Sequence, residues 1–409
     1  MEQDTVVIVG GGPAGLFCAI GSAGKNRNVI VLEKNPGCGK KLLITGSGQC
    51  NLTHVGKFSA FSSHYGDHGV FVRPALMQYT NHDLVRFFEE QGLLMTIETG
   101  GKIFPRSRQA ADVLAVLLAV CQRRGVDIRC NEAVLELKAC DGGFKVTSST
   151  ATFHADHLVL ATGGASYPAT GSTGDGYRLA RTLGLDVTEI APALTAVYVQ
   201  DYPFADLAGI SFEGLTISLF RGARKIRDLT GDLLFTHTGL SGPAVLDLSR
   251  FIAPGDVLKI AFIPGFDQGT ARKEFEAHIA GNGLRLVRTI LASYSLPERF
   301  IRRVLELSGI PPDMTCAHLS RKGRIALVTL LSGFPFPVHR LGGFHEAMVT
   351  RGGVSLDGIQ PKTMESRNVP HLYIIGELLD IDGDTGGYNL QAAFSTGFLA
   401  ARHIRSRSR

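Results

Sequence analysis

The chain carries a glycine-rich motif, GGGPAG at residues 10–15, directly after an apolar run at residues 5–9. This spacing is typical of a loop that binds the pyrophosphate of a dinucleotide. In such a loop the first glycine makes a tight turn, the second lets the backbone approach the pyrophosphate, and the third lets a helix pack on a sheet. The positive end of that helix and its free N–H groups favour the phosphate charge. The motif predicts a nucleotide-binding loop formed by Gly10, Gly12, Pro13, Ala14 and Gly15.

An acidic residue follows the second apolar run, which covers residues 28–32. This residue, Glu33, lies 18 residues after Gly15. A carboxylate about 20 residues beyond the glycines usually accepts hydrogen bonds from ribose hydroxyls. The same carboxylate would repel a 2′-phosphate, which argues against NADP at this site. Glu33 and its neighbour Lys34 are therefore predicted to bind the cofactor, and the remaining choice is between FAD and NAD.

Three further stretches favour FAD over NAD. Residues 39–51 carry two lysines, residues 158–164 are an apolar run that ends in Thr-Gly-Gly, and residues 372–390 end in a second glycine-rich helix start. Backbone N–H groups at that second start could face the N1/O2 edge of a flavin, where reduction places negative charge. The cofactor-binding candidates in these stretches are Lys40, Lys41, Thr45, Gly46, Asn51, Thr162, Gly163, Gly376, Glu377, Gly387, Tyr388, Asn389 and Leu390.

Two side chains are candidates for catalysis. His237 follows an apolar run and precedes a glycine-rich turn at residues 239–243, so it could act as an acid or base facing the flavin, although such a histidine more often caps a strand end. Tyr388 lies beside the second glycine-rich helix start and could close one side of a substrate pocket, or simply pack there. Cys50 is interpreted as a small packing residue.

A flavin would supply the redox chemistry and leaves three functions open. The first is an oxidase that takes a hydride from a small amine and passes the electrons to O₂. The second is a reductase in which NAD(P)H reduces the flavin, which then reduces a carbonyl or an alkene. The third is a non-catalytic flavin sensor. No second G-x-G-x-x-G motif occurs between residues 195 and 337, so a separate nicotinamide-binding domain is not expected, and this favours the oxidase.

The hydrophobic pattern divides the chain into three parts. Strand-like runs alternate with helical stretches over the first 193 residues, and this alternation predicts an α/β domain with a parallel sheet. Short strands dominate from Leu194, and helical spacing dominates from about residue 266. We expect an α/β domain at residues 1–193 and 356–409, an antiparallel β-barrel at 194–265 and 336–355, and a small helical domain at 266–335. Ser107 is the predicted N-cap of a helix that ends at Gly125.

Composition limits the partners and the compartment. Lys plus Arg is 42 and Asp plus Glu is 37, a mild excess, and the few clustered basic residues at the C-terminus do not indicate a nucleic-acid partner. No apolar run reaches the ~18 residues of a membrane span. The seven cysteines are odd in number and show no C-x-x-C spacing, so neither disulfides nor a metal site is expected. These observations indicate a cytoplasmic protein with a small-molecule substrate.

The motifs together resemble the BaiN-like flavoproteins, which include an aminoacetone oxidase. The resemblance rests on residues 10–15, 39–53, 161–177, 233–246, 352–367 and 375–397. It implies a Rossmann-like, glutathione-reductase-type FAD-binding domain with a β-barrel insert and a helical insert. Gln49 stands where the family usually has Arg, which implies a weaker hold on a charged group near the flavin. The FAD contacts implied by the resemblance are Ala14, Glu33, Lys40, Lys41, Gly46, Val134, Asp380, Asn389 and Leu390.

Overall fold

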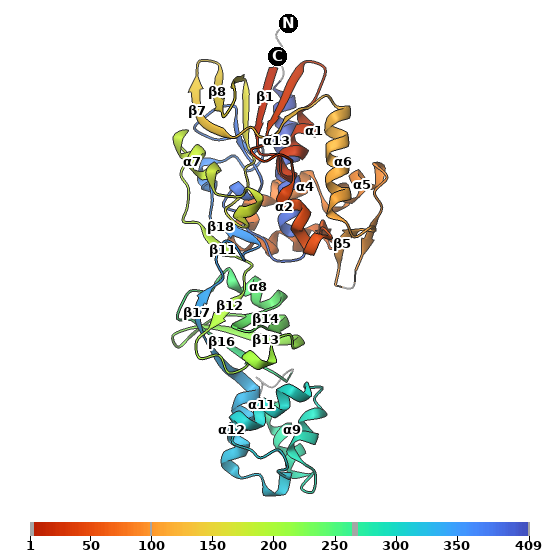
Figure 1. The fold of residues 1–409 in the computed structure, drawn as a ribbon, viewed down its shortest axis with the longest axis vertical. Coiled ribbons are helices and arrows are strands. Elements are labelled where there is room, and N and C mark those ends of the chain that lie inside the picture. The colour runs from red at the N-terminus through yellow and green to blue at the C-terminus, as the bar shows by residue number, and fades with distance from the viewer. Residues whose placement is uncertain (1–3, 99, 264–268, 408–409) are drawn as a thin grey trace. The chain divides into compact units, whose positions relative to one another are not determined.

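The computed structural model describes residues 4–98, 100–263 and 269–407. The chain forms two units (Figure 1). Unit 1 comprises Met1–Ala193 and Phe344–Arg409, and unit 2 comprises Leu194–Gly343. Among the described residues, no helix is long and apolar enough to cross a membrane.

Unit 1 is built on a parallel sheet of five strands in the order β19-β10-β1-β2-β6. Parallel neighbours need crossover connections, and helices supply several of them. The sheet strands are β1 (Asp4–Val9), β2 (Arg27–Leu32), β6 (Asp127–Arg129), β10 (His157–Leu160) and β19 (Leu372–Ile374), and the helices that pack on or near them are α1 (Pro13–Ser22), α6 (Ala110–Arg123) and α13 (Tyr388–Ser406). This arrangement confirms the predicted Rossmann-like α/β fold.

Smaller elements surround this sheet in unit 1. Two antiparallel sheets of three strands each have the orders β7-β8-β9 and β3-β5-β4. Their strands are β7 (Val134–Cys140), β8 (Gly143–Ser148), β9 (Thr152–Ala155), β3 (Thr53–His54), β5 (Lys102–Pro105) and β4 (Met95–Ile97). The remaining helices are α2 (Lys40–Ile44), α3 (Phe58–Phe61), α4 (Gly69–Gln78), α5 (Asn81–Glu90) and α7 (Asp175–Thr182).

The predicted N-cap of α6 is wrong. The helix begins at Ala110, and Gln109 rather than Ser107 occupies the cap position. Arg108 has a positive φ of 58°, so the backbone is left-handed there and cannot continue as an α-helix through this residue. The helix therefore starts only after that turn.

Unit 2 joins a closed barrel to a block of helices. The barrel order is β12-β15-β14-β13-β16-β17. Its strands are β12 (Val197–Val199), β13 (Ser211–Arg221), β14 (Arg224–Phe235), β15 (Gly239–Ser241), β16 (Val257–Ala261) and β17 (Phe334–Leu341), and its helices are α8 (Pro243–Ser249), α9 (Gly269–Ala280), α10 (Val287–Ala292), α11 (Glu298–Leu307) and α12 (Arg321–Gly333).

The barrel and the helical block share one hydrophobic core. The ring of Phe300 on α11 lies 4.5 Å from that of Phe262, and Phe262 in turn lies 6.0 Å from Phe235 on β14. All three rings are buried. Because such edge and tilted ring contacts stabilise beyond plain burial, we expect the two parts to unfold together.

The second boundary of the insert differs from the expectation that the barrel continues to residue 355. The last barrel strand, β17, ends at Leu341, and unit 1 resumes at Phe344. The next strand, β18 (Val349–Arg351), pairs with β11 (Ala191–Ala193) of unit 1 instead of rejoining the barrel. A short β-pattern gives no information about its partner, so the sequence alone did not separate these alternatives.

We expect a buried histidine on β10 to make the protein less stable in acid. Burial first, and the nearby His371 second, lower the pKa of His157 from 6.5 to about 4. The unfolded chain therefore binds a proton on this histidine more readily than the folded protein does. As a result, the free energy of unfolding falls by about 2–3 kcal/mol as the pH drops from about 7 to about 4. No described residue forms a hydrogen bond with the Nδ1 atom of His157. His157→Leu should therefore flatten the pH dependence of urea unfolding between pH 7 and pH 4.5, and an unchanged slope would contradict this account.

Candidate functional site

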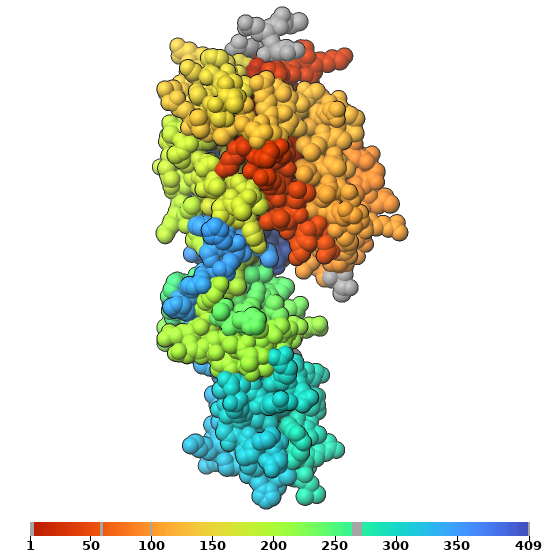
Figure 2. All heavy atoms as spheres, in the orientation of Figure 1, coloured from red at the N-terminus to blue at the C-terminus, as the bar shows by residue number. Residues whose placement is uncertain are grey.

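A large pocket in unit 1 lies where the predicted cofactor motifs meet. It encloses about 1460 Å³, part of it open to solvent. Its wall includes Val9, Leu32 and Ala161, which stand at or just beyond the carboxyl ends of β1, β2 and β10. This edge of an open α/β sheet is where such folds bind their ligands. In Figure 2 the N-terminal segment, in red, lies beside the yellow-green segment around residue 170 on the surface of this unit.

The glycines of the 10–15 loop differ in how closely the rest of the protein packs against them. Gly10 has a φ of 111°, and a Cβ there would lie 2.5 Å from the carbonyl oxygen of Ala161. A Cβ on Gly15 would lie 2.0 Å from the carbonyl oxygen of Gly10, so only glycine allows α1 to pack this closely. A Cβ on Gly12, in contrast, would meet no protein atom within 4 Å, although Gly12 lines the pocket. The space above Gly12 at the start of α1 therefore fits a pyrophosphate.

Glu33 is held in place at the pocket wall by backbone and side-chain donors. Its Oε2 atom accepts a hydrogen bond from the Gly11 N–H at 2.8 Å. Its Oε1 atom accepts bonds from the N–H and the Nδ2 of Asn35, at 2.8 and 2.7 Å. Only 8% of the residue is exposed, and Oε2, which accepts one bond from the described residues, can accept a further one. This fixed carboxylate fits the hydroxyls of a ribose.

Glu33→Ala should weaken cofactor binding without unfolding the protein. A charged hydrogen bond to a ribose hydroxyl is worth about 1.5–3 kcal/mol, or roughly a 10–150-fold change in Kd. Glu33→Gln keeps one acceptor oxygen and should lose only part of this. The measurement is flavin retained after dialysis, with the melting temperature of the flavin-free protein as the control for folding. Full flavin retention in Glu33→Ala would place Glu33 outside the cofactor site.

Two ion pairs line the same pocket. Lys41 Nζ contacts both carboxylate oxygens of Glu377, at 3.0 and 2.7 Å, and Glu377 also accepts the Thr350 N–H at 2.9 Å. Lys34 Nζ lies 2.5 Å from Asp175 Oδ2. Each pair joins segments that are far apart in the chain. Glu377 thus partly neutralises the positive charge of Lys41. Lys41 would therefore attract a pyrophosphate less strongly than an unpaired lysine would.

Most of the predicted cofactor-binding residues line this pocket. They are Gly10, Gly12, Pro13, Ala14, Glu33, Lys34, Lys40, Lys41, Thr45, Val134, Thr162, Gly163, Gly376, Glu377, Asn389 and Leu390. Gly15, Gly46, Asn51, Asp380, Gly387 and Tyr388 do not line it. Gly15 and Gly387 pack against protein backbone instead, the latter with a Cβ position 2.7 Å from Thr53. Asp380 accepts a hydrogen bond from the Thr188 hydroxyl at 3.0 Å.

The pocket also includes residues that the sequence reasoning missed. Asn35, Glu132, Met348 and Val349 line it, as do residues 170–173 and Asp175. The last group falls within the 161–177 motif that carried the family resemblance, so that motif was the available signal. Asn35 followed Glu33 by two residues and offered no independent pattern.

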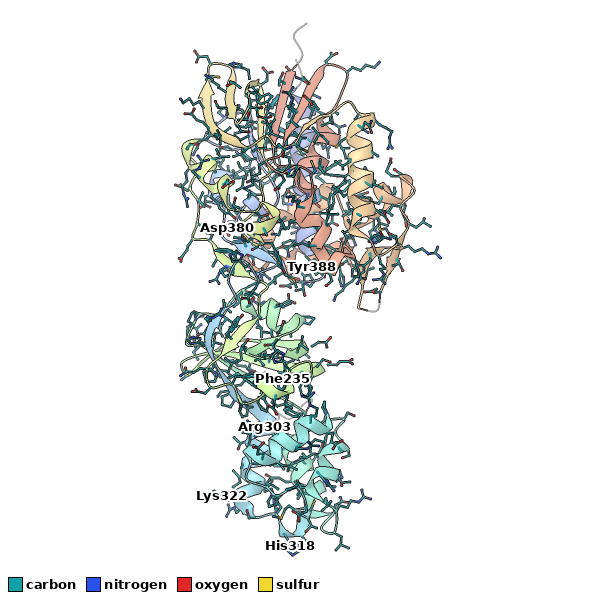
Figure 3. The ribbon with its side chains drawn as sticks, in the orientation of Figure 1. Phe235, Arg303, His318, Lys322, Asp380 and Tyr388 are labelled. Atoms are coloured by element: carbon teal, nitrogen blue, oxygen red, sulfur yellow. The ribbon has the colours of Figure 1, made fainter. Side chains whose placement is uncertain are left out.

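The structure assigns Tyr388 to a stacked cluster of rings beside the start of α13. Its ring lies 3.9 Å from the ring of His64 at 16° and 5.3 Å from that of His54 at 18°. The hydroxyl of Tyr65 donates to the Tyr388 carbonyl at 2.8 Å. Only 5% of Tyr388 is exposed, and Figure 3 labels it together with Asp380. Tyr388 is therefore a packed, oriented ring next to two residues of the pocket wall, Asn389 and Leu390.

His64 is the residue of this cluster best placed to exchange a proton. Its Nδ1 atom lies 2.9 Å from Asp384 Oδ2, and the Asp384 N–H donates to the His64 carbonyl at 3.0 Å. About a third of the His64 side chain is exposed. A carboxylate on one ring nitrogen fixes the ring and determines which nitrogen carries the proton. The sequence analysis did not single out His64, because nothing local marks it.

The other predicted features fall elsewhere. His237 lies in unit 2, in the turn between β14 and β15, and its catalytic role stays a prediction. Gln49 accepts a hydrogen bond from Arg108 Nη1 at 3.3 Å. A guanidinium is therefore present next to the position where the family usually has Arg.

No group of three or more His, Cys, Asp or Glu within the described residues could hold a metal ion.

The family model of the HI0933-like protein Rossmann domain matches residues 4–403. The chain belongs to the HI0933-like family. It is 35% identical to the 3-dehydro-bile acid delta(4,6)-reductase of Clostridium scindens, over 99% of this chain and 100% of that protein. It is 30% identical to the ribosomal RNA dihydrouridine synthase of Escherichia coli, over 99% of this chain and 98% of that protein. The structure of the 3-ketosteroid delta1-dehydrogenase of Sterolibacterium denitrificans shares the fold, with a TM-score of 0.53 at 13% identity and full coverage of both chains.

These findings confirm several of the expectations from the sequence. The family resemblance holds, and the protein is an enzyme, an FAD-dependent oxidoreductase. Its cofactor is FAD, and the residues of the unit 1 pocket fit that cofactor. The expected use of O₂ finds no support in the names of these relatives, which are a reductase and a synthase of a reduced nucleoside.

Proposed function

We propose that this chain is an FAD-dependent reductase that saturates a carbon–carbon double bond conjugated to a carbonyl group. The observation that carries the proposal is the full-length relationship to two enzymes whose names describe one chemistry. A delta(4,6) bile acid with a 3-keto group contains C=C bonds conjugated to C=O. The uracil ring that becomes dihydrouridine contains the same unit. The amine oxidase favoured by the sequence has no such support, whereas the reductase alternative does.

The reaction needs a hydride, a proton and a place for developing negative charge. FAD held by the residues of the unit 1 pocket would, once reduced by NAD(P)H, supply the hydride. The hydride adds to the carbon β to the carbonyl, and a proton adds to the α carbon. Charge develops on the carbonyl oxygen, so a hydrogen-bond donor aimed there stabilises the transition state. The chain's own residues must orient the substrate, donate this bond and deliver the proton.

Within the proposal, His64 delivers the proton and the Tyr388 ring positions it. About a third of the His64 side chain is exposed, and Asp384 fixes its ring by the 2.9 Å contact. Tyr388 stacks on the face of that ring at 3.9 Å. A proton donor held by a carboxylate at its edge and a ring on its face is oriented before substrate arrives, which lowers the cost of reaching the reactive geometry.

An anaerobic half-reaction experiment tests the proposed function. The purified flavoprotein is mixed with NADH or NADPH, and bleaching of the flavin absorbance is followed. The reduced protein is then mixed in separate reactions with a steroid 4-en-3-one, with uridine-containing RNA, or with air. Rapid reoxidation by one of the conjugated carbonyl compounds, with formation of the saturated product, supports the reductase. Bleaching by aminoacetone and rapid reoxidation by air alone would establish the amine oxidase instead.

A further inference from the structure

We propose that an exposed basic surface in the helical block of unit 2 binds the phosphate backbone of folded RNA. The surface consists of Arg285, Arg288, Arg321 and Lys322, and we call it the basic surface. The inference rests on the proposed function, because a uracil ring in RNA is one of its two substrate candidates. It adds to that function the place where the RNA is held.

The helical block carries the entire charge excess of the chain. Residues 269–333 contain ten Lys or Arg and five Asp or Glu, and the net charge of the whole chain is +5. The rest of the chain is therefore balanced. A single net charge for the whole chain hides this separation, and for that reason the composition did not indicate a nucleic-acid partner. Concentrated positive charge on one part of a protein is the electrostatic signature of a polyanion-binding surface.

Two backbone segments bring the basic surface together. A β-bridge joins residues 286 and 315, and the Cys316 N–H donates to the Arg285 carbonyl at 2.9 Å. The segment that holds Arg285 thus lies directly beside the one that leads into α12, whose first two residues are Arg321 and Lys322. Figure 3 labels Lys322 and His318 near the same end of the helical block, which is drawn in cyan in Figure 2.

The cations of the basic surface lie in two segments without acidic residues, although Glu298 and Asp313 border these segments. Residues 281–297 and 314–333 contain five Lys or Arg and no Asp or Glu. All four side chains of the surface are exposed, and the described part of the chain offers them no ion pair. The arginines of α11 differ, because Arg302 pairs with Glu298 at 3.3 Å and Arg303 with Glu306 at 2.7 Å. Unneutralised, exposed cations remain available to an outside anion.

Helix stability does not explain the basic residues at the start of α12. Its first turn holds Arg321 and Lys322 and no acidic residue. The partial positive charge of a helix N-terminus disfavours cations there. A bound phosphate would offset this repulsion, so the arrangement has a stability cost in the free protein that an anionic partner removes.

Folded RNA fits this surface better than an unpaired strand. Three of the four cations are arginines, whose planar guanidinium groups bind phosphate oxygens in pairs. The block offers no exposed aromatic side chain in its described part, since Phe275 and Phe300 are buried and Tyr294 is half-buried. Single-strand binders use exposed aromatic residues on which the bases stack. Contacts to the backbone of an A-form helix need none.

The test compares two variants of the full-length flavoprotein with equal net charge. In the first, all four residues of the basic surface are changed to Glu. In the control, four exposed cations of unit 1, namely Lys25, Arg124, Lys138 and Lys145, are changed to Glu. Protein-free ribosomal RNA and a fluorescent RNA hairpin are the probes, and Kd is measured from low to moderate salt. Flavin content and circular dichroism check that both variants are folded.

We expect the basic-surface variant to bind RNA at least tenfold more weakly than the wild type and the control. The slope of log K against log salt should fall by about three to four, because about one counterion is released for each phosphate contact. Equal affinities of the two variants, or binding of the wild type to phosphatidylserine vesicles or polyglutamate but not to RNA, would overturn the inference. If the wild type binds RNA through this surface but reduces no conjugated carbonyl compound, the surface stands and the proposed function fails. If it reduces a steroid enone and binds no RNA, the proposed function is supported and the RNA-binding surface is ruled out.

Discussion

Gly15→Ala should yield a protein that purifies without flavin. The added Cβ would lie 2.0 Å from the Gly10 carbonyl oxygen and 3.3 Å from the Ala161 Cβ. Because the closest atom is backbone, the start of α1 must move away from the end of β1. That movement displaces the N–H groups that would meet the pyrophosphate. We expect copurified FAD to fall at least 100-fold.

The same substitution should also destabilise the folded protein. Overpacking in a core costs about 1–3 kcal/mol, and each kcal/mol lowers the melting temperature of a domain of this size by about 2–4 °C. Calorimetry of the flavin-free protein measures this separately from cofactor loss. A variant with normal flavin content and normal melting temperature would show that α1 can shift at no cost, contrary to the close packing described here.

Two further glycines act as matched controls for Gly15→Ala. Gly12→Ala adds a Cβ that meets no protein atom within 4 Å, so the flavin-free protein should keep its melting temperature. The methyl group would nevertheless occupy the space that fits the pyrophosphate, so FAD affinity should fall. Gly37→Ala adds a Cβ that likewise meets nothing, at a position outside the pocket wall, and should change neither quantity.

Those parts of the site that depend on local backbone geometry could be predicted from the sequence. Gly10, Gly12 and Gly15 are separated by fixed short distances because one turn and one helix start require them. Glu33 could be found because it ends the next strand of the same unit. The Gly376-Glu377 pair was recognisable for a similar reason, since an apolar strand, β19, ends just before it.

The rest of the site depends on contacts between distant segments. Val349 lines the pocket because β18 pairs with β11, although more than 150 residues separate the two strands. The stacked cluster likewise joins His64 to Tyr388, which are 324 residues apart. Neither contact produces a regular spacing of residues in the sequence, so no sequence pattern could predict it. The same reason explains why the barrel and the helical block looked like separate domains, whereas Phe262 and Phe300 join their cores.

His64→Gln should slow the reduction of a conjugated carbonyl substrate by about 100-fold or more. A positioned side chain that transfers a proton contributes roughly 10²–10⁴-fold to a rate, and glutamine keeps the hydrogen-bonding shape while losing the proton-transfer capacity. The readout is product formation in a single turnover of pre-reduced protein, measured across a range of pH. The pH dependence of the wild type should be lost in the variant. Flavin content and the rate of bleaching by NAD(P)H should stay unchanged, because His64 does not line the cofactor pocket.

Companion variants separate proton transfer from positioning. Tyr388→Phe keeps the ring that stacks at 3.9 Å on His64 and should cost much less than His64→Gln, whereas Tyr388→Ala removes the stacking and should cost more than Tyr388→Phe. Asp384→Asn should slow the reaction by disturbing the 2.9 Å contact that orients the histidine ring. His82→Gln, on the exposed side of α5, controls for the loss of a histidine and should have no effect. A normal rate in His64→Gln together with a large loss in Tyr388→Phe would instead make the tyrosine hydroxyl the proton donor, and His64 would then have no role in the reaction.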